Sequence, residues 1–261
     1  MLIYLNAEEK WAVHGYDPED YAQIDSLDWN LLAPYFIPAD SEVKHFLDAL
    51  FLSSHFSCKQ SDLDREGFIG KKSPNCTSQI TVLSHPDHEE VIFKLYLDRV
   101  KIKREAERFY QRIFGAELIR EYLKSRDESP ILIPKKWIYP IPKREGDDFH
   151  KERSKHYFIL IAEKIPASSP EEQLLLWKSA VQKEELIALY QIAFDLGLWD
   201  SVVPANALIT SEGKIALIDT EHYFYSVDFT RLECYLSKEM RAFWRSLSQK
   251  KQKHLRKFED Q

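Results

Sequence analysis

Residues 197–206 read GLWDSVVPAN, and residues 207–221 read ALITSEGKIALIDTE. The first stretch is predicted to be a loop after a helix, because Gly197 is the residue type expected just past a helix C-terminus. The second is predicted to be a tight β-hairpin, since two apolar runs flank the turn residues 211–213, which end in a glycine. A helix, a loop and a hairpin therefore follow one another in this part of the chain.

Three polar residues lie at the junctions of these elements. Asp200 and Asn206 lie in the loop, and Asp219 follows the second strand of the hairpin. This arrangement resembles the catalytic and metal-binding loops of the protein kinase-like superfamily, in which the loop Asp is the base and the loop Asn and the Asp of D-F-G hold magnesium. The resemblance implies that Asp200 is the base, that Asn206 and Asp219 are metal ligands, and that ATP and magnesium are the cofactors.

The preceding part of the chain agrees with this resemblance in order and residue type. Lys94 lies late in an apolar strand, and the helix after it carries Glu105 and Glu107, either of which is a candidate to pair with it. In the family, a strand lysine at this place grips the nucleotide phosphates. The resemblance therefore implies that Lys94 is a catalytic and phosphate-binding residue.

Two further segments occupy the places of nucleotide-binding elements. Gly67 and Gly70 lie about one hairpin before Lys94, where the family keeps its glycine-rich loop, although their spacing matches only in part. Residues 159–165 occupy the place of the strand and hinge that would hold the adenine, which makes Glu163 a candidate binding residue. A P-loop is rejected, because that motif needs four residues between its first glycine and a G-K-[ST] unit that this chain lacks.

The motifs also depart from the family pattern. Five residues separate Asp200 from Asn206 instead of four, and Leu and Trp at positions 198–199 replace the family's His-Arg. Thr and Glu at positions 220–221 replace the Phe and Gly of D-F-G. The comparison is therefore with divergent members: small-molecule phosphotransferases, bacterial effector kinases and pseudokinases.

The extra loop residue has to be accommodated before Asn206. Pro204 fixes its own φ and biases Val203 toward an extended conformation, so the segment 202–205 is expected to bulge. Asp200 then keeps its place facing a cleft between the lobes, where the groups of Lys94, Asn206 and Asp219 are expected to converge.

Each of these residues also has a simpler structural interpretation. Asp219 is a common residue type for capping a turn at a strand end. Lys94 would then be a solvated strand lysine or the partner of a helix acid, and Asp200 a loop residue that caps backbone groups near Gly197.

The wider pattern predicts an α+β fold with two lobes. The predicted N-lobe has a small antiparallel sheet and one long charged helix from about residue 99 to 124, and the C-lobe is mainly helical. The expected boundaries are an N-terminal helical extension at 1–60, the N-lobe at 61–165 and the C-lobe at 166–261. Strands are expected at 79–83, 91–96, 131–133 and 157–161, and helices from 41, from 169 and at 183–196.

Two clusters of polar residues are given ordinary roles. His85 and His88 form an H-P-D-H sequence in a predicted turn without a third ligand nearby, so they are interpreted as solvated and not as a zinc site. The basic residues of the C-terminal segment are interpreted as a solvated helix face, with a partner surface as the alternative.

Composition excludes several classes of protein. Of the 261 residues, 44% are hydrophobic and 30% charged, with only 7 Gly, which is a folded globular composition. Lys and Arg number 36 against 42 Asp and Glu, so the net charge of −6 provides no global field for nucleic acid or an anionic membrane. We expect no nucleic-acid partner and no membrane span.

The location is expected to be cytoplasmic. The three cysteines are odd in number and form no C-x-x-C pair, which favours a reducing compartment. The N-terminus has no basic region and turns acidic too early for a signal peptide. Export as a bacterial effector without such a signal stays open.

The sequence thus predicts an ATP- and magnesium-dependent phosphotransferase whose acceptor is unknown. The alternative is a catalytically inactive kinase-like module that binds a protein partner through its N-terminal segment and basic C-terminal helix. The altered loop spacing and the missing His-Arg favour that alternative.

Overall fold

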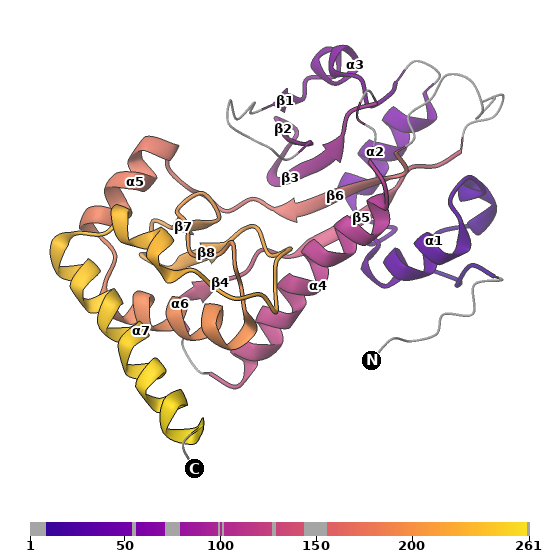
Figure 1. The fold of residues 1–261 in the computed structure, drawn as a ribbon. Coiled ribbons are helices and arrows are strands. Elements are labelled where there is room, and N and C mark those ends of the chain that lie inside the picture. The colour runs from indigo at the N-terminus through magenta and orange to yellow at the C-terminus, as the bar shows by residue number, and fades with distance from the viewer. Residues whose placement is uncertain are drawn as a thin grey trace. The chain divides into compact units, whose positions relative to one another are not determined.

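The chain forms two compact units, shown as a ribbon in Figure 1. The first unit comprises residues 1–110 and 135–164, and the second comprises residues 111–134 and 165–261. The expected glycine-rich stretch continues into residues 71–73, which lie outside the described residues. A computed structural model describes residues 9–53, 56–70, 79–98, 100, 102–126, 129–143 and 156–259, the last part of the C-terminal helix as backbone only.

Helices precede the sheet of the first unit. The longest of them is capped by Ser41, whose hydroxyl accepts a hydrogen bond from the backbone N–H of Lys44 at 3.2 Å. Its apolar residues Val43, Leu47 and Phe51 recur at helical spacing and are buried, as the sequence predicts. The helical elements are η1 (Pro18–Tyr21), α1 (Ser26–Leu32), η2 (Ala33–Tyr35), α2 (Glu42–Leu52) and α3 (Gln60–Arg65).

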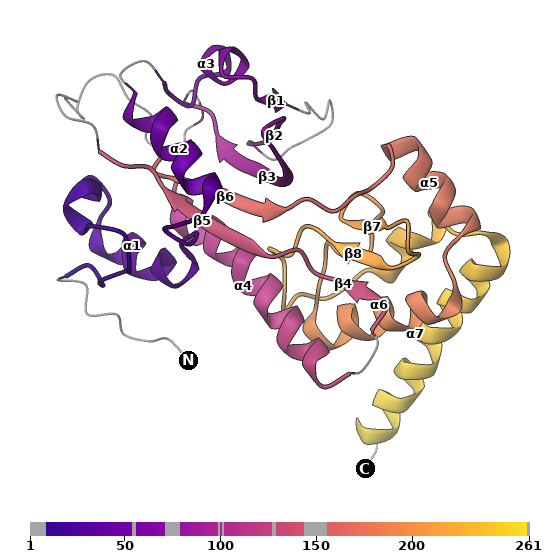
Figure 2. The same ribbon diagram turned by 180° about the vertical axis from the view of Figure 1, so that it is seen from behind.

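The first unit is built on a five-stranded antiparallel sheet in the order β1-β2-β3-β6-β5. Figure 2, from behind, shows β6 and β5 side by side, as their register requires. The sequence predicts β2, β3 and β6, whereas β1 and β5 are found only in the structure. The strands are β1 (Ile69–Gly70), β2 (Ile80–His85), β3 (His88–Tyr96), β5 (Lys136–Pro140) and β6 (Phe158–Glu163).

The two faces of β3 carry different residues. Val91 and Phe93 belong to the hydrophobic core of this unit, together with the buried apolar residues of α2. Lys94 and Tyr96 lie on the opposite face, because successive side chains of a strand alternate. The Tyr96 ring lies 5.5 Å from the ring of Phe109, so this second face is packed against the start of the helix that follows.

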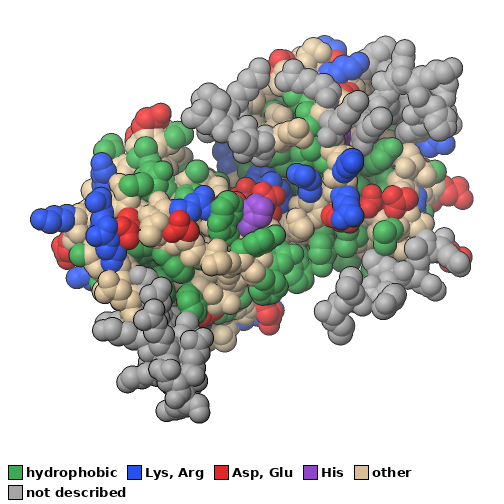
Figure 3. Space-filling view, viewed as in Figure 1, with side chains coloured by type: hydrophobic (Ala, Val, Ile, Leu, Met, Phe, Trp, Pro, Cys, Tyr) green, Lys and Arg blue, Asp and Glu red, His purple; other side chains and the backbone are tan. Residues whose placement is uncertain are grey.

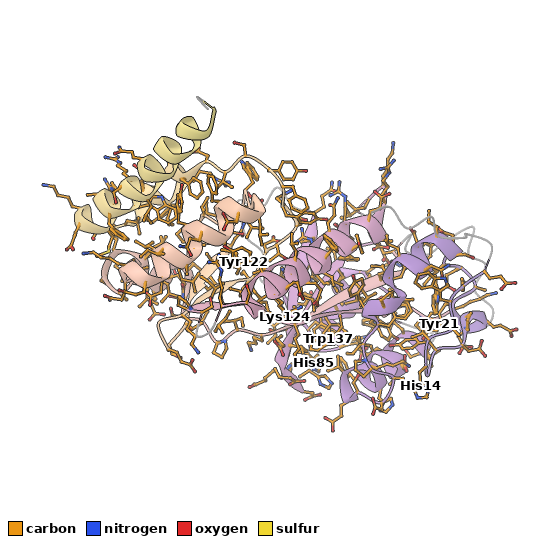
Figure 4. All side chains as sticks on the ribbon, turned by 90° about the horizontal axis from the view of Figure 1, so that it is seen from below. His14, Tyr21, His85, Tyr122, Lys124 and Trp137 are labelled. Atoms are coloured by element: carbon orange, nitrogen blue, oxygen red, sulfur yellow. The ribbon has the colours of Figure 1, made fainter. Side chains whose placement is uncertain are left out.

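The histidines of the β2–β3 hairpin are not solvated, which corrects the sequence interpretation. His85 and His88 are 5% and 8% exposed, because both rings pack 4.6 Å from the ring of Phe46 on α2. The Nε2 atom of His85, labelled in Figure 4, lies 2.9 Å from the backbone carbonyl of Glu66. Only the two residues between the histidines form the turn.

The long helix α4 (Glu105–Lys124) begins later than the predicted residue 99. Arg104, directly before it, has a φ of 59°, which is incompatible with a continuous helix from upstream. The boundary between the two units falls inside α4, after Tyr110. Its fully buried residues are Ala106, Phe109, Ile113, Ala116 and Ile119.

Among the described residues, the second unit contains a three-stranded sheet, the C-terminal part of α4 and four further helical elements. The sheet has the order β4-β8-β7, in which β4 and β8 are parallel and β8 and β7 antiparallel. The segment 131–133 is thus a strand, as predicted, but it pairs with the C-terminal hairpin. The elements are β4 (Ile131–Leu132), α5 (Pro170–Ser179), α6 (Lys183–Leu196), β7 (Ala207–Ile209), β8 (Ile215–Leu217), η3 (Phe229–Tyr235) and α7 (Lys238–Glu259).

Local signals define the helices α5 and α6. Ser169 and Glu172 form a capping box at the start of α5, with each side chain accepting from the other's backbone N–H. Gly197 ends α6 with a φ of 61°, as predicted. The indole N–H of Trp177 on α5 donates to the carbonyl of Ala207 at 3.0 Å, which ties α5 to the hairpin.

The hydrophobic core of the second unit lies among α5, α6, α7 and the hairpin. The Tyr190 ring of α6 meets the Trp244 ring of α7 edge-on at 5.6 Å, and both are buried. The hydroxyl of Tyr122, labelled in Figure 4, donates to Asp195 on α6 at 2.6 Å. The C-terminal part of α4 is therefore attached to this core.

The surface of the second unit carries charges of both signs. Over α5 and the start of α7, Figure 3 shows Lys and Arg side chains beside Asp and Glu side chains. Arg245 of α7, for example, is more than half exposed and pairs with Glu233.

Among the helices of the described residues, none has the length and apolar character that crossing a membrane would require. With a sheet-bearing first unit and a mainly helical second unit, the α+β, two-lobed prediction is confirmed.

Candidate functional site

The β7–β8 hairpin brings two of the predicted site residues to the same end. Ala207 pairs with Leu217, and the backbone N–H of Ile218 donates to the carbonyl of Asn206 at 2.9 Å. Asp219 follows directly. The tight pairing therefore places Asn206 and Asp219 as near neighbours across the open end of the hairpin, although Asp219 is 13 positions after Asn206 in the sequence.

The loop before the hairpin is closed by the Asn206 side chain. Its amide nitrogen donates to the backbone carbonyl of Asp200 at 3.0 Å. The carbonyl of Val203 accepts from the backbone N–H groups of both Asn206 and Ala207, so a turn containing Pro204 takes up the chain between Asp200 and Asn206. Because the amide nitrogen faces Asp200, the amide oxygen of Asn206 faces the other way.

Asp219 and Glu221 are held by one arginine of α4. Arg112 Nη1 lies 2.9 Å from Asp219 Oδ1, and Nη2 lies 2.6 Å from Glu221 Oε2. The Arg112 side chain is 5% exposed, against 26% and 20% for the two carboxylates. A planar guanidinium suits this double contact, because its N–H groups form a rigid fork.

The residue between the two acids is also fixed to α4. The Thr220 hydroxyl donates to the backbone carbonyl of Arg112 at 2.7 Å. Gly115 lies so close that a Cβ on it would be 1.8 Å from the Thr220 carbonyl oxygen. Asp219, Thr220 and Glu221 thus each contact Arg112 on α4. Thr and Glu at positions 220–221 therefore have a packing role in this structure.

The Asp200 carboxylate has two cationic or ionisable neighbours. Arg231 Nη1 donates to Asp200 Oδ1 at 3.2 Å, and His222 Nε2 lies 3.3 Å from Asp200 Oδ2. Arg231 also donates to the carbonyl of Trp199 and lies over that indole ring at 4.5 Å. Although the sequence lacks His-Arg before Asp200, the fold therefore supplies a histidine and an arginine from elsewhere.

Sequence reasoning missed four of these residues: Arg112, Gly115, His222 and Arg231. Arg112 lies three positions after the buried Phe109, and Gly115 is the only glycine of that helix. A charged residue on the buried stripe beside a glycine is a signal of close packing against another segment. For His222 and Arg231 no local signal exists, because their proximity to Asp200 depends on how residues 222–231 fold back.

The remaining predicted residues lie in the first unit. Lys94 on β3 is 6% exposed and stands beside Leu160 in the sheet. Glu163 ends β6, and its carboxylate accepts from the backbone N–H of Lys135 at 2.8 Å. Gly67 has a φ of 85°, which favours glycine, and Gly70 pairs with Leu83 in the edge strand β1.

The two candidate partners of Lys94 have other contacts in this structure. Glu107 is half exposed and pairs with Arg104 at 3.3 Å. Glu105 is buried, and its carboxylate lies 3.0 Å from His156 Nδ1 while accepting from the backbone N–H of Tyr157 at 2.8 Å. A second contact, 2.8 Å from His156 Nε2 to the carbonyl of Val100, completes a buried network.

This network makes the stability of the chain depend on pH. Burial raises the pKa of Glu105, more than its contacts lower it. Burial lowers the pKa of His156, but its contacts with Glu105 and with a backbone carbonyl outweigh burial and raise it. Burial and the Asp25 carboxylate raise the pKa of Asp28 to about 6. The folded chain thus binds protons more tightly than the unfolded chain at these groups, so their contribution to stability falls as pH rises.

We expect the free energy of unfolding to fall between about pH 5 and pH 8 on account of the buried pair. The contribution of the Glu105–His156 pair to the free energy of unfolding is complete below the ordinary histidine pKa. It is lost as pH rises through the raised pKa of His156. Urea unfolding across this range measures the slope, which Glu105→Gln should flatten and which a change at the exposed His14 (Figure 4) should leave alone. Equal slopes in the wild type and Glu105→Gln would contradict this prediction.

No group of three or more His, Cys, Asp or Glu residues suited to a metal ion occurs within the described part of the chain. Asn206 and Asp219 would therefore have to hold a metal together with oxygen atoms of a ligand or water. Magnesium is commonly bound in this way, with one or two protein groups and substrate phosphates completing the shell.

Comparisons with known proteins give a distant similarity. No family model matches the sequence, and no curated protein matches it. Among solved structures, the chain is similar to the bifunctional kinase-methyltransferase WbdD, with 14% identity and a TM-score of 0.33 over 60% of this chain. A second structure of WbdD gives 15% identity and a TM-score of 0.32 over 60% of this chain. The chain covers 34% and 33% of those two solved chains.

Proposed function

We propose that this chain is an ATP- and magnesium-dependent phosphotransferase of the kinase-like type, acting on a hydroxyl acceptor. The observation that carries the proposal is the end of the β7–β8 hairpin, where Asn206 and Asp219 are near neighbours and the Asn206 amide closes the loop that begins at Asp200. Phosphoryl transfer asks the protein mainly for positioning and charge neutralisation, which a rigid hairpin with these side chains can supply.

The donor atoms of the hairpin suit magnesium. The Asn206 oxygen faces away from the Asp200 carbonyl, because the amide nitrogen takes that contact. A carboxylate has two oxygens and about four lone-pair sites, so the contact of Asp219 with Arg112 is compatible with a metal contact. Bound magnesium would neutralise charge on the nucleotide phosphates, and Asn206 and Asp219 are the residues proposed to hold it.

The other roles follow from the sequence resemblance. Lys94 is proposed to bind the phosphates, with Gly67, Gly70 and Glu163 contributing to nucleotide binding. Asp200, which the resemblance gives as the base, is proposed to act at the acceptor hydroxyl. The acceptor itself is not defined by these residues, since in a shared fold the substrate is selected by surfaces that vary between members.

One observation favours the alternative of an inactive kinase-like module that binds a protein partner. Arg112 already places a positive charge on Asp219, where the proposal requires a metal ion. A protein that has replaced magnesium by an arginine would keep the fold without needing the nucleotide. Nucleotide binding therefore distinguishes the two functions.

The test of the proposal is the substitution Asp219→Asn. We expect the affinity for ATP in the presence of magnesium to fall by about tenfold or more, because the amide has no charge and is a weaker ligand for a hard dication. Isothermal titration calorimetry measures this directly. A bound nucleotide at a hundredfold excess over Kd should also stabilise the wild type by about 2.7 kcal/mol.

Glu212→Gln is the matched control, because it removes one carboxylate from the turn at the other end of the same hairpin, where Glu212 is 69% exposed. This variant should bind ATP like the wild type. If Asp219→Asn binds ATP like the wild type, Asp219 is not a ligand of the metal ion. A wild type that binds no ATP with magnesium would favour the inactive module.

A further inference from the structure

His222 occupies a fixed position beside Asp200 that the proposed function does not yet use. Its Nε2 atom lies 3.3 Å from Asp200 Oδ2 and 3.7 Å from Glu221 Oε1. The ring stands edge-on to the rings of Trp199 and Tyr225, at 5.6 and 5.8 Å. The side chain is 37% exposed, against 21% for Asp200, so the imidazole is the more accessible of the two groups.

Backbone contacts hold the histidine segment against the end of α6. The N–H of Trp199 donates to the carbonyl of His222 at 3.2 Å, and the N–H of Phe224 donates to the carbonyl of Leu196 at 2.8 Å. Phe224 has a φ of 61°, a strained conformation for a bulky residue that tends to occur at functional sites. The close approach depends on Gly197, where a Cβ would be 2.6 Å from the carbonyl of Tyr225.

The neighbours of the ring determine which nitrogen carries the proton. Carboxylates only accept, so a neutral imidazole next to Asp200 and Glu221 carries its hydrogen on Nε2. Its Nδ1 then has a lone pair. Asp200 is in turn oriented by Arg231, which donates to Oδ1 at 3.2 Å. A carboxylate that fixes the tautomer and orientation of a histidine is the arrangement that makes imidazole a general base.

We infer that His222, and not Asp200, accepts the proton of the acceptor hydroxyl, and that Asp200 is a positioning residue for it. This inference rests on the proposed phosphotransferase function. In the step, the acceptor oxygen forms a bond to the γ-phosphorus of ATP, and the bond from that phosphorus to the β–γ bridging oxygen breaks, releasing ADP. The hydroxyl proton passes to His222 Nδ1, and the imidazolium formed later returns it to water.

The test compares His222→Ala, Asp200→Asn and the double variant, using water as the acceptor and release of inorganic phosphate from ATP as the rate. His222→Ala should lower the rate by about 10²-fold or more, since general-base contributions are typically 10² to 10⁴. Its affinity for ATP with magnesium should stay within about twofold of wild type by calorimetry. The double variant should be no slower than the slower single variant, because the two residues act as a unit.

Two readouts separate a base from a structural residue. Free imidazole should restore part of the rate to His222→Ala, because the exposed ring leaves an opening that imidazole can enter. The pH profile of the rate should also differ between the wild type and His222→Ala, because the variant lacks the group that accepts the proton; the described charged groups close to the ring are Asp200 and Glu221, with Arg231 bound to the other oxygen of Asp200. His14→Ala, which removes an exposed histidine of the first unit, is the control and should change nothing.

The outcomes are distinct. A His222→Ala protein that turns over ATP like the wild type, or that loses affinity for ATP in parallel with rate, overturns the inference. A wild type that binds ATP, but transfers the γ-phosphoryl group neither to water nor to any hydroxyl compound tested, also overturns the inference. In that case the proposal that the chain binds a nucleotide is kept. A wild type that fails to bind ATP in calorimetry overturns the proposed function itself, and with it the role of His222.

Discussion

Arg112→Met is expected to destabilise the folded chain by about 2–4 kcal/mol. Removing one partner of a buried ion pair costs about 3–5 kcal/mol, because an uncompensated charge stays behind. Here Asp219 and Glu221 would both lose their contact with Arg112, but they are 26% and 20% exposed, so water recovers part of the loss. Urea unfolding monitored by tryptophan fluorescence measures the change.

The matched control is Lys124→Met, on the same helix. Lys124 pairs with Glu121, and both side chains are 72% exposed, so this surface pair should contribute less than about 1 kcal/mol. Combining Arg112→Met with Glu221→Gln should restore part of the stability, since it removes one of the two negative charges that Arg112 contacts in the wild type. An Arg112→Met protein as stable as Lys124→Met would show that the contacts of Arg112 with Asp219 and Glu221 make no net contribution to the free energy of unfolding.

Gly115→Ala is the second change with a large expected effect. In an open helix this substitution usually stabilises by about 1 kcal/mol, because alanine has the higher helix propensity. Here the new Cβ would lie 1.8 Å from the carbonyl oxygen of Thr220, which is backbone and buried. Overpacking of this kind costs about 1–3 kcal/mol and sometimes more, so the net effect should be destabilising.

The substitution also has a local consequence that can be measured separately. Pushing Thr220 away from α4 lengthens its hydrogen bond to the Arg112 carbonyl and displaces the neighbouring Asp219. Under the proposed function, ATP binding should therefore weaken more in Gly115→Ala than in Gly213→Ala. At Gly213 nothing lies within 4 Å and only the positive φ of 80° resists a side chain, so that variant controls for backbone strain. Wild-type stability in Gly115→Ala would contradict the close packing.

The elements that the sequence predicted are those whose signals are local. The α6 boundaries follow from apolar spacing and from Gly197, the start of α5 from the Ser169 cap, and the hairpin from two apolar runs around Gly213. In each case the residues that define the element are also its neighbours in space. Capping and turn formation need no distant partner, so they can be predicted from a short window of sequence.

Elements whose residues are defined by distant partners were missed or misinterpreted. The strand β5 ends in Pro140, and a proline cannot donate to a sheet, yet it is tolerated here because β5 is an edge strand. His85 and His88 flank a polar turn, but Phe46, about 40 residues earlier, packs against both rings and buries them. Which residues come to cover a turn is decided by packing, and no local pattern records it.

The candidate site divides in the same way. The sequence by itself determined that Asp200, Asn206 and Asp219 lie at the ends of a loop and a hairpin, because hairpin pairing is a local interaction. The tertiary structure alone decided that Arg112 holds Asp219, and that His222 and Arg231 contact Asp200. Those charges meet across 107, 22 and 31 residues of chain, and such contacts form only when the core of the second unit has brought the segments together.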